Sequence, residues 1–309
     1  MQYSTQNIEK VKLLLEVLPI VMDERCFALH GGTAINFFLL DMPRLSVDID
    51  LTYIPLHERK SSFEKINHSL KTIDNKVKQI NSNIKSVHNE NRAKLYIKNN
   101  LGAEIKVEVN LTNRGIIDPY VERELSPKVK ERFSTSFSIP LVPIKQVYGG
   151  KICAGLSRQN IRDLFDGYQL LNNIGFNDEI KEGFLFFLLS TKESLSRILD
   201  PPLTHLEEKT VKNFQGMTET PFTYKQHKET LQNLISEVNA KLTEQDKEFL
   251  ISFKAGSPDW SLYDWKDFPG VQWKLQNILI LKKDPVLHRK KMDKFISVLN
   301  YSKPKPTWY

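Results

Sequence analysis

The fold is decided by residues 26–51, which read CFALHGGTAINFFLLDMPRLSVDIDL. The apolar start, 26–29, predicts a short strand that runs into a glycine turn at Gly31 and then into an apolar helix. The end of the stretch alternates apolar and acidic residues with a period of two. Because side chains alternate between the two faces of a strand, Asp48 and Asp50 project from the same face. The sequence therefore predicts a glycine turn followed by paired carboxylates on one strand.

The turn and the carboxylates are residue types that hold a phosphate and a divalent cation. A glycine turn at a helix start exposes backbone N–H groups and Thr33 adds a hydroxyl, so Gly31, Gly32 and Thr33 could cradle a phosphate. By itself such a turn is more often an ordinary tight turn. Asp48 and Asp50, about 7 Å apart along the strand, could share Mg²⁺, which takes oxygen ligands and keeps water and substrate phosphates in its shell. The alternative is an exposed edge strand.

A second acidic strand follows later in the chain. Helices are predicted over 7–22 and 61–81, and strands over 95–98 and 103–111, joined by a hairpin turn at 99–102. In the last strand Glu108 points away from the apolar residues beside it. A two-metal site usually has a third carboxylate, so Glu108 is the best candidate for a third ligand.

After Pro143 the pattern becomes almost wholly helical. Helices are predicted over 145–172, 179–199, 222–240 and 243–254. One stripe of the first of these helices carries residues at steps of three or four: Lys151, Gly155, Arg158, Arg162 and Asp166, with Asp163 to one side. Its cations could grip a triphosphate or an acceptor. The alternative is a ladder of ion pairs on a solvated face.

Composition excludes several classes of protein. The chain has 309 residues and two cysteines, both in apolar stretches, which excludes a secreted disulfide scaffold. No apolar run approaches the roughly 20 residues that span a bilayer, and the first residues do not resemble a leader peptide. We therefore expect a cytoplasmic protein with no membrane segment.

The net charge of +7 is concentrated in two segments. Residues 51–100 carry ten Lys and Arg against four Asp and Glu, and residues 251–309 carry eleven against five. Such segments could follow a phosphate backbone, or they could be no more than solvated surface.

Three parts of the chain resemble motifs of a known family. Residues 30–34 and 44–51 look like the first motif of the DNA polymerase β-like nucleotidyltransferase superfamily, in the form found in AbiEii/MenT toxins. Lys151 with residues 162–166 is similar to that family's lysine helix and its Arg-Asp-x-x-Asp motif. Residues 269–278 resemble its closing segment.

The resemblance implies an α+β fold in two domains. Residues 1–143 would form a polymerase β-like nucleotidyltransferase domain with a small mixed sheet. Residues 144–309 would form a mostly α-helical domain that completes the active site and the acceptor groove. The implied reaction is transfer of NMP from an NTP, with Mg²⁺ or Mn²⁺, to an acceptor hydroxyl, with a tRNA 3′ end as the first choice of acceptor. The implied biology is a toxin of a bacterial toxin–antitoxin system with a separately encoded antitoxin.

The family's site residues carry over to positions of this sequence that match its motifs. Asp48, Asp50 and Glu108 would hold the metal, although an aspartate is frequent at the third position in the superfamily. Asp163 or Asp166 would serve as base or orienting group, and the sequence does not choose between them. Contacts with the nucleotide are expected from Gly31, Gly32, Thr33, Ser46, Lys151, Arg158 and Arg162.

Two other hypotheses remain open from the sequence. The same fold could act on a small molecule or a protein side chain, which would need no basic groove. The protein could instead be a catalytically inert member that only binds a nucleotide or a partner. Retention of Asp48, Asp50, Lys151, Arg162 and Asp163 together argues against an inert descendant.

Overall fold

The computed structural model describes residues 3–203 and 214–301. The chain divides into two compact units, each of which is built from two stretches of sequence. The first unit is Met1–Val147 with Leu206–Gln226, and the second is Tyr148–His205 with His227–Tyr309.

The first unit is built on a mixed sheet of seven strands in the order β3-β4-β5-β2-β1-β7-β6. Its strands are β1 (Phe27–His30), β2 (Asp48–Tyr53), β3 (Ile84–Asn89), β4 (Lys94–Asn99), β5 (Glu104–Val109), β6 (Val121–Glu124) and β7 (Ser138–Leu141). Its helical elements are α1 (Thr5–Met22), α2 (Gly31–Ala34), the π-helical η1 (Ile35–Leu39), α3 (Arg59–Ile80), the 3₁₀ turn η2 (Glu90–Arg92) and α4 (Pro127–Phe133). The pairs β2–β5 and β1–β7 are parallel, and the remaining pairs are antiparallel. The predicted mixed sheet is confirmed, with three strands (β3, β6 and β7) that the sequence did not reveal.

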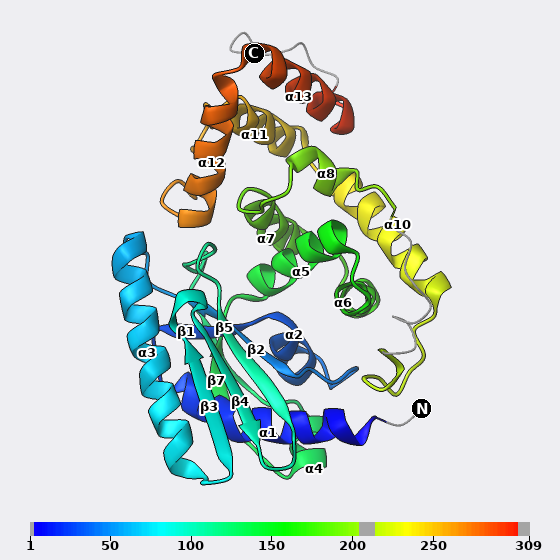
Figure 1. The fold of residues 1–309 in the computed structure, drawn as a ribbon. Helices are drawn as coiled ribbons and strands as arrows, with labels where there is room; N and C mark the ends of the chain where they lie inside the picture. The colour runs from blue at the N-terminus through cyan, green and yellow to red at the C-terminus, as the bar shows by residue number, and fades with distance from the viewer. Residues whose placement is uncertain (1–2, 204–213, 302–309) are drawn as a thin grey trace. The chain divides into compact units, whose positions relative to one another are not determined.

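Helices α1 and α3 cover one face of this sheet (Figure 1). The strands turn apolar side chains toward them, and these residues are fully or nearly fully buried: Ile49, Leu51, Ile84, Leu95, Ile97, Ile105 and Val107. Most alternate residues of the same strands are polar and stay half-buried or exposed; the exceptions are Thr52, which is buried, and Val87, which is apolar and exposed. Burial of the apolar face fixes the strand register, so the opposite face presents the polar side chains.

A late segment of the chain returns to the first unit. The Leu45 N–H donates to the Met217 carbonyl (2.7 Å), and the Ser4 N–H donates to the Gly216 carbonyl (3.0 Å). The division of the chain after residue 143 stays a prediction about its domains, and these contacts add that residues 214–226 pack with the first unit.

The second unit is helical. It contains most of α5 (Ile144–Arg158), then α6 (Ile161–Asn173), α7 (Asp178–Leu188), α8 (Leu195–Leu199), most of α10 (Tyr224–Lys241), α11 (Glu244–Lys254), α12 (Pro269–Lys282) and α13 (Pro285–Val298). Aromatic rings form part of its core, and Tyr263 and Trp265 stack with their centroids 4.3 Å apart. Trp265 lies in this core, whereas Trp273 is 38% exposed.

The single helix predicted over 145–172 is wrong, because the chain breaks between α5 and α6. Gln159 has φ +52°, in the left-handed region. The Asn160 side chain then caps the new helix by accepting the Arg162 N–H (3.0 Å). The His227 ring lies 3.1 Å from the Gln159 carbonyl. The residues predicted to share one helical stripe therefore lie on two helices.

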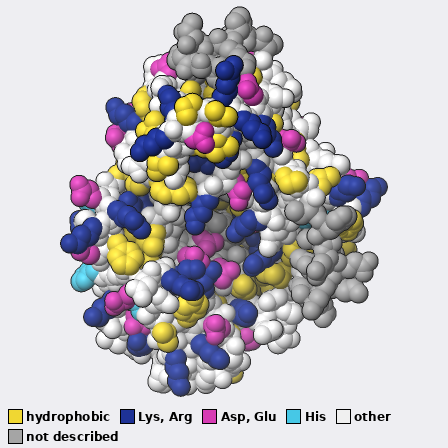
Figure 2. Space-filling model, turned by 45° about the horizontal axis from the view of Figure 1, so that its top comes forward, with side chains coloured by type: hydrophobic (Ala, Val, Ile, Leu, Met, Phe, Trp, Pro, Cys, Tyr) yellow, Lys and Arg dark blue, Asp and Glu magenta, His cyan; other side chains and the backbone are white. Residues whose placement is uncertain are grey.

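No helix in the described ranges is both long and apolar enough to cross a membrane. The two basic segments of the sequence fall in different units, 51–100 in the first and 251–309 in the second. Lys and Arg side chains are accordingly spread over the face drawn in Figure 2, with acidic side chains among them.

Gly149 allows α5 to contact the backbone of α7. A Cβ at Gly149 would overlap the backbone of Gly183 and Phe184. Gly149→Ala should therefore lower the free energy of unfolding by about 3 kcal/mol, because backbone cannot move aside as a side chain can. In the same helix, a Cβ at Gly155 would meet a Leu164 methyl at 3.4 Å, an ordinary contact. Gly155→Ala should change stability by less than about 1 kcal/mol. Urea denaturation of both variants tests this, and equal losses would contradict it.

Lys274 belongs to the segment that resembles the family's closing motif. It is buried, and its Nζ donates to the carbonyls of Thr191 (2.8 Å) and Glu193. Burial, and then the neighbouring charge of Lys254, lowers the pKa of Lys274 from 10.5 to about 8. This lysine holds the chain between α7 and α8 against α12.

The lowered pKa of Lys274 predicts a pH dependence of stability. Between pH 8 and 10.5 the folded protein binds fewer protons here than the unfolded chain. The free energy of unfolding should therefore rise with pH across that window, by on the order of 3 kcal/mol from this group. Lys274→Met should abolish the increment. Lys282→Met is the control, because Lys282 is exposed and its Nζ donates to the Ala255 carbonyl (2.9 Å). Identical pH profiles for Lys274→Met and the wild type would contradict this origin.

Candidate active site

The glycine turn lies directly against the side chain of Asp50. His30 and Asp50 are Cα partners in the antiparallel β1–β2 pair, so the turn that follows β1 begins beside this aspartate. Gly31 has φ +73°, and a Cβ there would overlap the Asp50 carboxylate. Glycine satisfies both requirements, since it tolerates positive φ and carries no Cβ. The backbone of the turn therefore touches one of the two predicted metal ligands.

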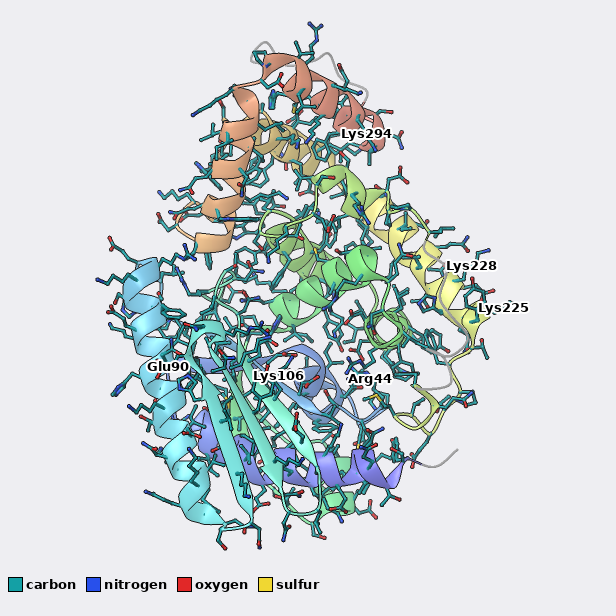
Figure 3. All side chains as sticks on the ribbon, in the orientation of Figure 1. Arg44, Glu90, Lys106, Lys225, Lys228 and Lys294 are labelled. Atoms are coloured by element: carbon teal, nitrogen blue, oxygen red, sulfur yellow. The ribbon has the colours of Figure 1, made fainter. Side chains whose placement is uncertain are left out.

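Gly32 brings the same turn against a buried arginine. A Cβ at Gly32 would lie 2.7 Å from Arg44 Nη2 and 3.1 Å from Ser46 Oγ. Arg44 is buried, and its Nη1 donates to the Leu45 carbonyl (2.8 Å) (Figure 3). Arg44 therefore places a positive charge next to the turn.

The hydroxyls of Thr33 and Ser46 lie inside the protein. Thr33 is fully buried, and its Oγ1 lies 3.0 Å from Ser46 Oγ and 2.5 Å from the Asp48 carbonyl oxygen. These contacts tie the turn to the start of β2. The contacts predicted between these two hydroxyls and a nucleotide stay predictions, and the interactions present here are with the protein itself.

Asp48 and Asp50 stand on the polar face of the sheet beside two charged residues of β5. Their Cα partners in the parallel β2–β5 pair are Lys106 and Glu108 respectively. Both aspartates are half-buried and flank the fully buried Ile49. The period-two pattern of the sequence thus corresponds to one strand with its carboxylates on one side.

Glu108 is held by two lysines. Its Oε1 lies 2.7 Å from Lys94 Nζ, and its Oε2 lies 2.6 Å from Lys106 Nζ. Burial raises the pKa of Glu108, but hydrogen bonds from Lys106 and Lys94 outweigh burial and leave it below its ordinary value. For Lys106 the directions are reversed. Burial lowers its pKa, but the hydrogen bond to Glu108 and the charges of Asp48 and Asp50 outweigh burial and leave the pKa above its ordinary value. A charged ladder therefore runs from the aspartates across β5 to β4.

The donor set suits a hard cation held by two carboxylates. Mg²⁺ is commonly bound by one or two protein carboxylates, with water and substrate phosphates completing its shell, and Asp48 and Asp50 supply such a pair. Both oxygens of Glu108 contact lysines, and its predicted role as a third metal ligand stays a prediction. Within residues 3–203 and 214–301, no three His, Cys, Asp or Glu side chains gather closely enough to hold a metal ion.

The second unit contains a buried ion cluster between α5 and α6. Lys151 Nζ lies 3.0 Å from Asp163 Oδ1 and 3.1 Å from Asp166 Oδ2. Arg158 Nη2 lies 2.7 Å from Asp163 Oδ2. Asp166 is fully buried, whereas the Arg158 side chain is 64% exposed. The break at Gln159 folds α6 back so that its aspartates meet the lysine of α5.

Two further residues lie near this cluster on the same helices. Arg162 is half-buried in the first turn of α6. The Tyr148 hydroxyl is buried and has no hydrogen-bond partner among the described residues. Burial raises the pKa of Tyr148, and the charge of Asp166 raises it further. Tyr148 therefore adds a neutral, desolvated group near Asp166.

Three charged residues of the first unit received no role from the sequence. Arg44 was inside the quoted motif, and its burial could not be read from a single sequence. Lys94 and Lys106 belong to strands of alternating polar residues, and that alternation was the available signal. Lys106 lies two residues before Glu108 on the same strand, whereas the contact of Lys94 with Glu108 becomes visible only when β4 and β5 are paired.

Comparison with known proteins agrees with the motifs. The sequence matches the family described as "Nucleotidyl transferase AbiEii toxin, Type IV TA system" over residues 12–277. None of the curated proteins matches this chain in sequence. In structure it is similar to MenT4, a nucleotidyltransferase toxin from Mycobacterium tuberculosis H37Rv, with a TM-score of 0.56 and 10% sequence identity, over 89% of this chain and 95% of that one.

The match to the family covers most of the chain, and the likeness to MenT4 shows the fold. The expected family and α+β fold class are thereby confirmed. The chain belongs to the AbiEii nucleotidyltransferase toxin family, and it is a nucleotidyltransferase.

Proposed function

We propose that this protein transfers a nucleoside monophosphate from an NTP to an acceptor hydroxyl of RNA, with a tRNA 3′ end as the first choice. The observation that carries the proposal is the contact between the glycine turn and Asp50, with Asp48 on the same strand face. This arrangement brings backbone N–H groups suited to phosphate next to carboxylates suited to Mg²⁺ or Mn²⁺.

The reaction is an in-line displacement at the α-phosphorus. A bond forms between the acceptor oxygen and the α-phosphorus, the bond from that phosphorus to the bridging β-oxygen breaks, and pyrophosphate leaves. The acceptor hydroxyl gives its proton to the carboxylate that serves as base. A bound divalent ion supplies charge neutralisation and orientation of the phosphates.

Residues of the first unit bind and position the nucleotide. Asp48 and Asp50 are the metal ligands in this proposal, and Gly31 and Gly32 present the backbone of the turn to phosphate. Arg44, buried beside the turn, adds positive charge. Thr33 and Ser46 hold the turn against β2 through their hydroxyls. Glu108 orients Lys94 and Lys106, a role that follows from its two ion pairs.

Residues of the second unit supply cations and a carboxylate. Lys151 neutralises triphosphate charge, and Arg158 and Arg162 contact the nucleotide or the acceptor. Asp163 is preferred over Asp166 as base or orienting group. Both aspartates are buried, but Asp163 also contacts Arg158, whose side chain is exposed. Asp166 then serves to hold Lys151.

The family supports a toxin that is paired with an antitoxin. We extend this to a separately encoded antitoxin and to a cytoplasmic location. Transfer to a small molecule or a protein side chain is the competing function. RNA is preferred because the surface next to Asp48 is rich in lysine, and a small acceptor does not need such a surface.

Replacing Asp48 and Asp50 by Ala should abolish transfer. The purified protein is incubated with each α-³²P-labelled NTP, Mg²⁺ and total bacterial RNA. We expect label in a tRNA-sized band with the wild type and at least about a hundredfold less with the double variant, since neither carboxylate remains to hold the metal. Label in a protein or small-molecule fraction instead would overturn the RNA acceptor. Label in no fraction would overturn transfer and favour an inert binding protein.

The roles of the two units are tested by combining Asp48→Asn with Lys151→Met. If both residues act on the same step, the double variant should be hardly slower than the slower single variant. Lys181→Met is a matched control for lost stability. Lys181 forms a buried ion pair with Asp246 (3.0 Å) in the second unit and has no proposed role in transfer. It should lower the melting temperature but keep activity. Multiplying rate losses in the double variant would argue that Lys151 acts elsewhere.

A further inference from the structure

A lysine-rich surface continues from the paired aspartates across the polar face of β5, β4 and β3. The register aligns Asp48 with Lys106, Lys106 with Tyr96, and Tyr96 with Val87. Since neighbouring strands lie about 4.8 Å apart, this row extends roughly 14 Å from Asp48. We name this the β3–β5 face. Its charged residues on these three strands are Lys85, Lys94, Lys98, Glu104, Lys106 and Glu108.

On β3 and β4 this face carries two lysines that lie opposite each other. Lys85 and Lys98 are Cα partners in the antiparallel β3–β4 pair, and both are exposed. Glu104 lies across from Lys98 on the other side, yet in the described part of the chain neither lysine makes an ion pair. Like charges directly opposite each other destabilise a sheet. An anion bound between them would remove that cost.

An aromatic ring and an apolar side chain lie among these lysines. Tyr96 is half-buried on β4, and its partner Val87 on β3 is 66% exposed. Leu95 and Ile97, which flank Tyr96, face the core. Tyr96 thus stands on the same face as the lysines. Cations that track phosphates, interleaved with aromatic rings on which bases stack, are typical of surfaces that bind single-stranded nucleic acid.

We infer that the β3–β5 face binds the single-stranded end of the RNA acceptor, with Lys85 and Lys98 on its phosphates and Tyr96 stacked on a base. The inference rests on the proposed function, because it takes RNA as the acceptor. The row starts at Asp48, so a strand lying along it ends beside the paired aspartates. A duplex is disfavoured, because its bases are not free to stack on a side chain.

The experiment measures binding without transfer. Asp48→Ala/Asp50→Ala protein, without NTP, is titrated into a fluorescein-labelled single-stranded RNA oligonucleotide at several salt concentrations. Adding Lys85→Gln and Lys98→Gln should weaken binding about tenfold or more. It should also reduce the slope of log K against log salt by about 1.4, the value for two lost phosphate contacts on a single strand. Tyr96→Leu should weaken binding about tenfold, whereas Tyr96→Phe, which keeps the ring, should stay within about twofold of the parent.

A charge-matched control lies on the other side of the sheet. Lys60 and Lys71 are exposed on α3, which packs against the opposite face. Changing both Lys60 and Lys71 to Gln removes the same net charge as changing Lys85 and Lys98. The β3–β5 face is supported only if the Lys60/Lys71 variant binds RNA as tightly as the parent protein. An equal loss of RNA affinity in the Lys60/Lys71 and Lys85/Lys98 variants would show a non-specific effect of charge and overturn the inference.

Three further results would overturn it. Unchanged RNA binding in the Lys85/Lys98 and Tyr96 variants would exclude this face, even if wild-type protein labels RNA and the proposed function stands. Equal binding of the same RNA as a duplex would exclude base stacking. Poly-glutamate serves as a probe for an acidic protein partner. If it binds the parent but not the Lys85/Lys98 variant, and RNA binds both equally, the face binds an acidic protein instead of RNA. If the Lys85/Lys98 and Tyr96→Leu variants lose RNA binding but the wild-type protein labels no RNA in the transfer assay, the binding face stands and the proposed reaction is refuted.

Discussion

The approach of the Gly31 backbone to Asp50 is the constraint on which the candidate site depends. Strand β1 delivers the chain to the point where its antiparallel partner β2 carries Asp50. The chain can turn there only with a positive φ and without a Cβ. The buried hydroxyls of Thr33 and Ser46 then join the turn to β2. The site is therefore supported by the pairing of two central strands and by the core behind them, which makes its geometry stiff.

Around the candidate site, each of the two units contains a group of ion-paired side chains. In the first unit Glu108 bridges Lys94 and Lys106, and in the second unit Lys151 bridges Asp163 and Asp166. A buried charge without a partner is expensive, and each of these ion pairs holds its members in place. A group placed in this way is ready for a charged substrate, because little reorganisation is needed when the substrate binds.

The two aspartates and the helical second half could be read from the sequence because their signals are local. Alternation with period two placed Asp48 and Asp50 on one face of a strand, and the family motifs identified the nucleotidyltransferase class. The break at Gln159 was harder to recognise, because glutamine is uncommon in the left-handed region. Asn160 before Ile161 is nevertheless a usual helix start, and reading it as an N-cap would have divided the helix. Strand β6 was invisible because all four of its residues are exposed, so no burial pattern marks it.

The sequence alone determined the local elements of the site, because turn chemistry, strand alternation and helical periodicity depend on neighbouring residues, and the resemblance of its motifs indicated the class of the protein. Only the tertiary structure decided which distant residues meet. The pairing of β4 with β5 brought Lys94 to Glu108, and the folding back of α6 brought Asp163 and Asp166 to Lys151. The packing of the turn on β2 buried Thr33 and Arg44. Such contacts depend on strand register and helix packing, which the whole core sets together, and no single stretch of sequence specifies them.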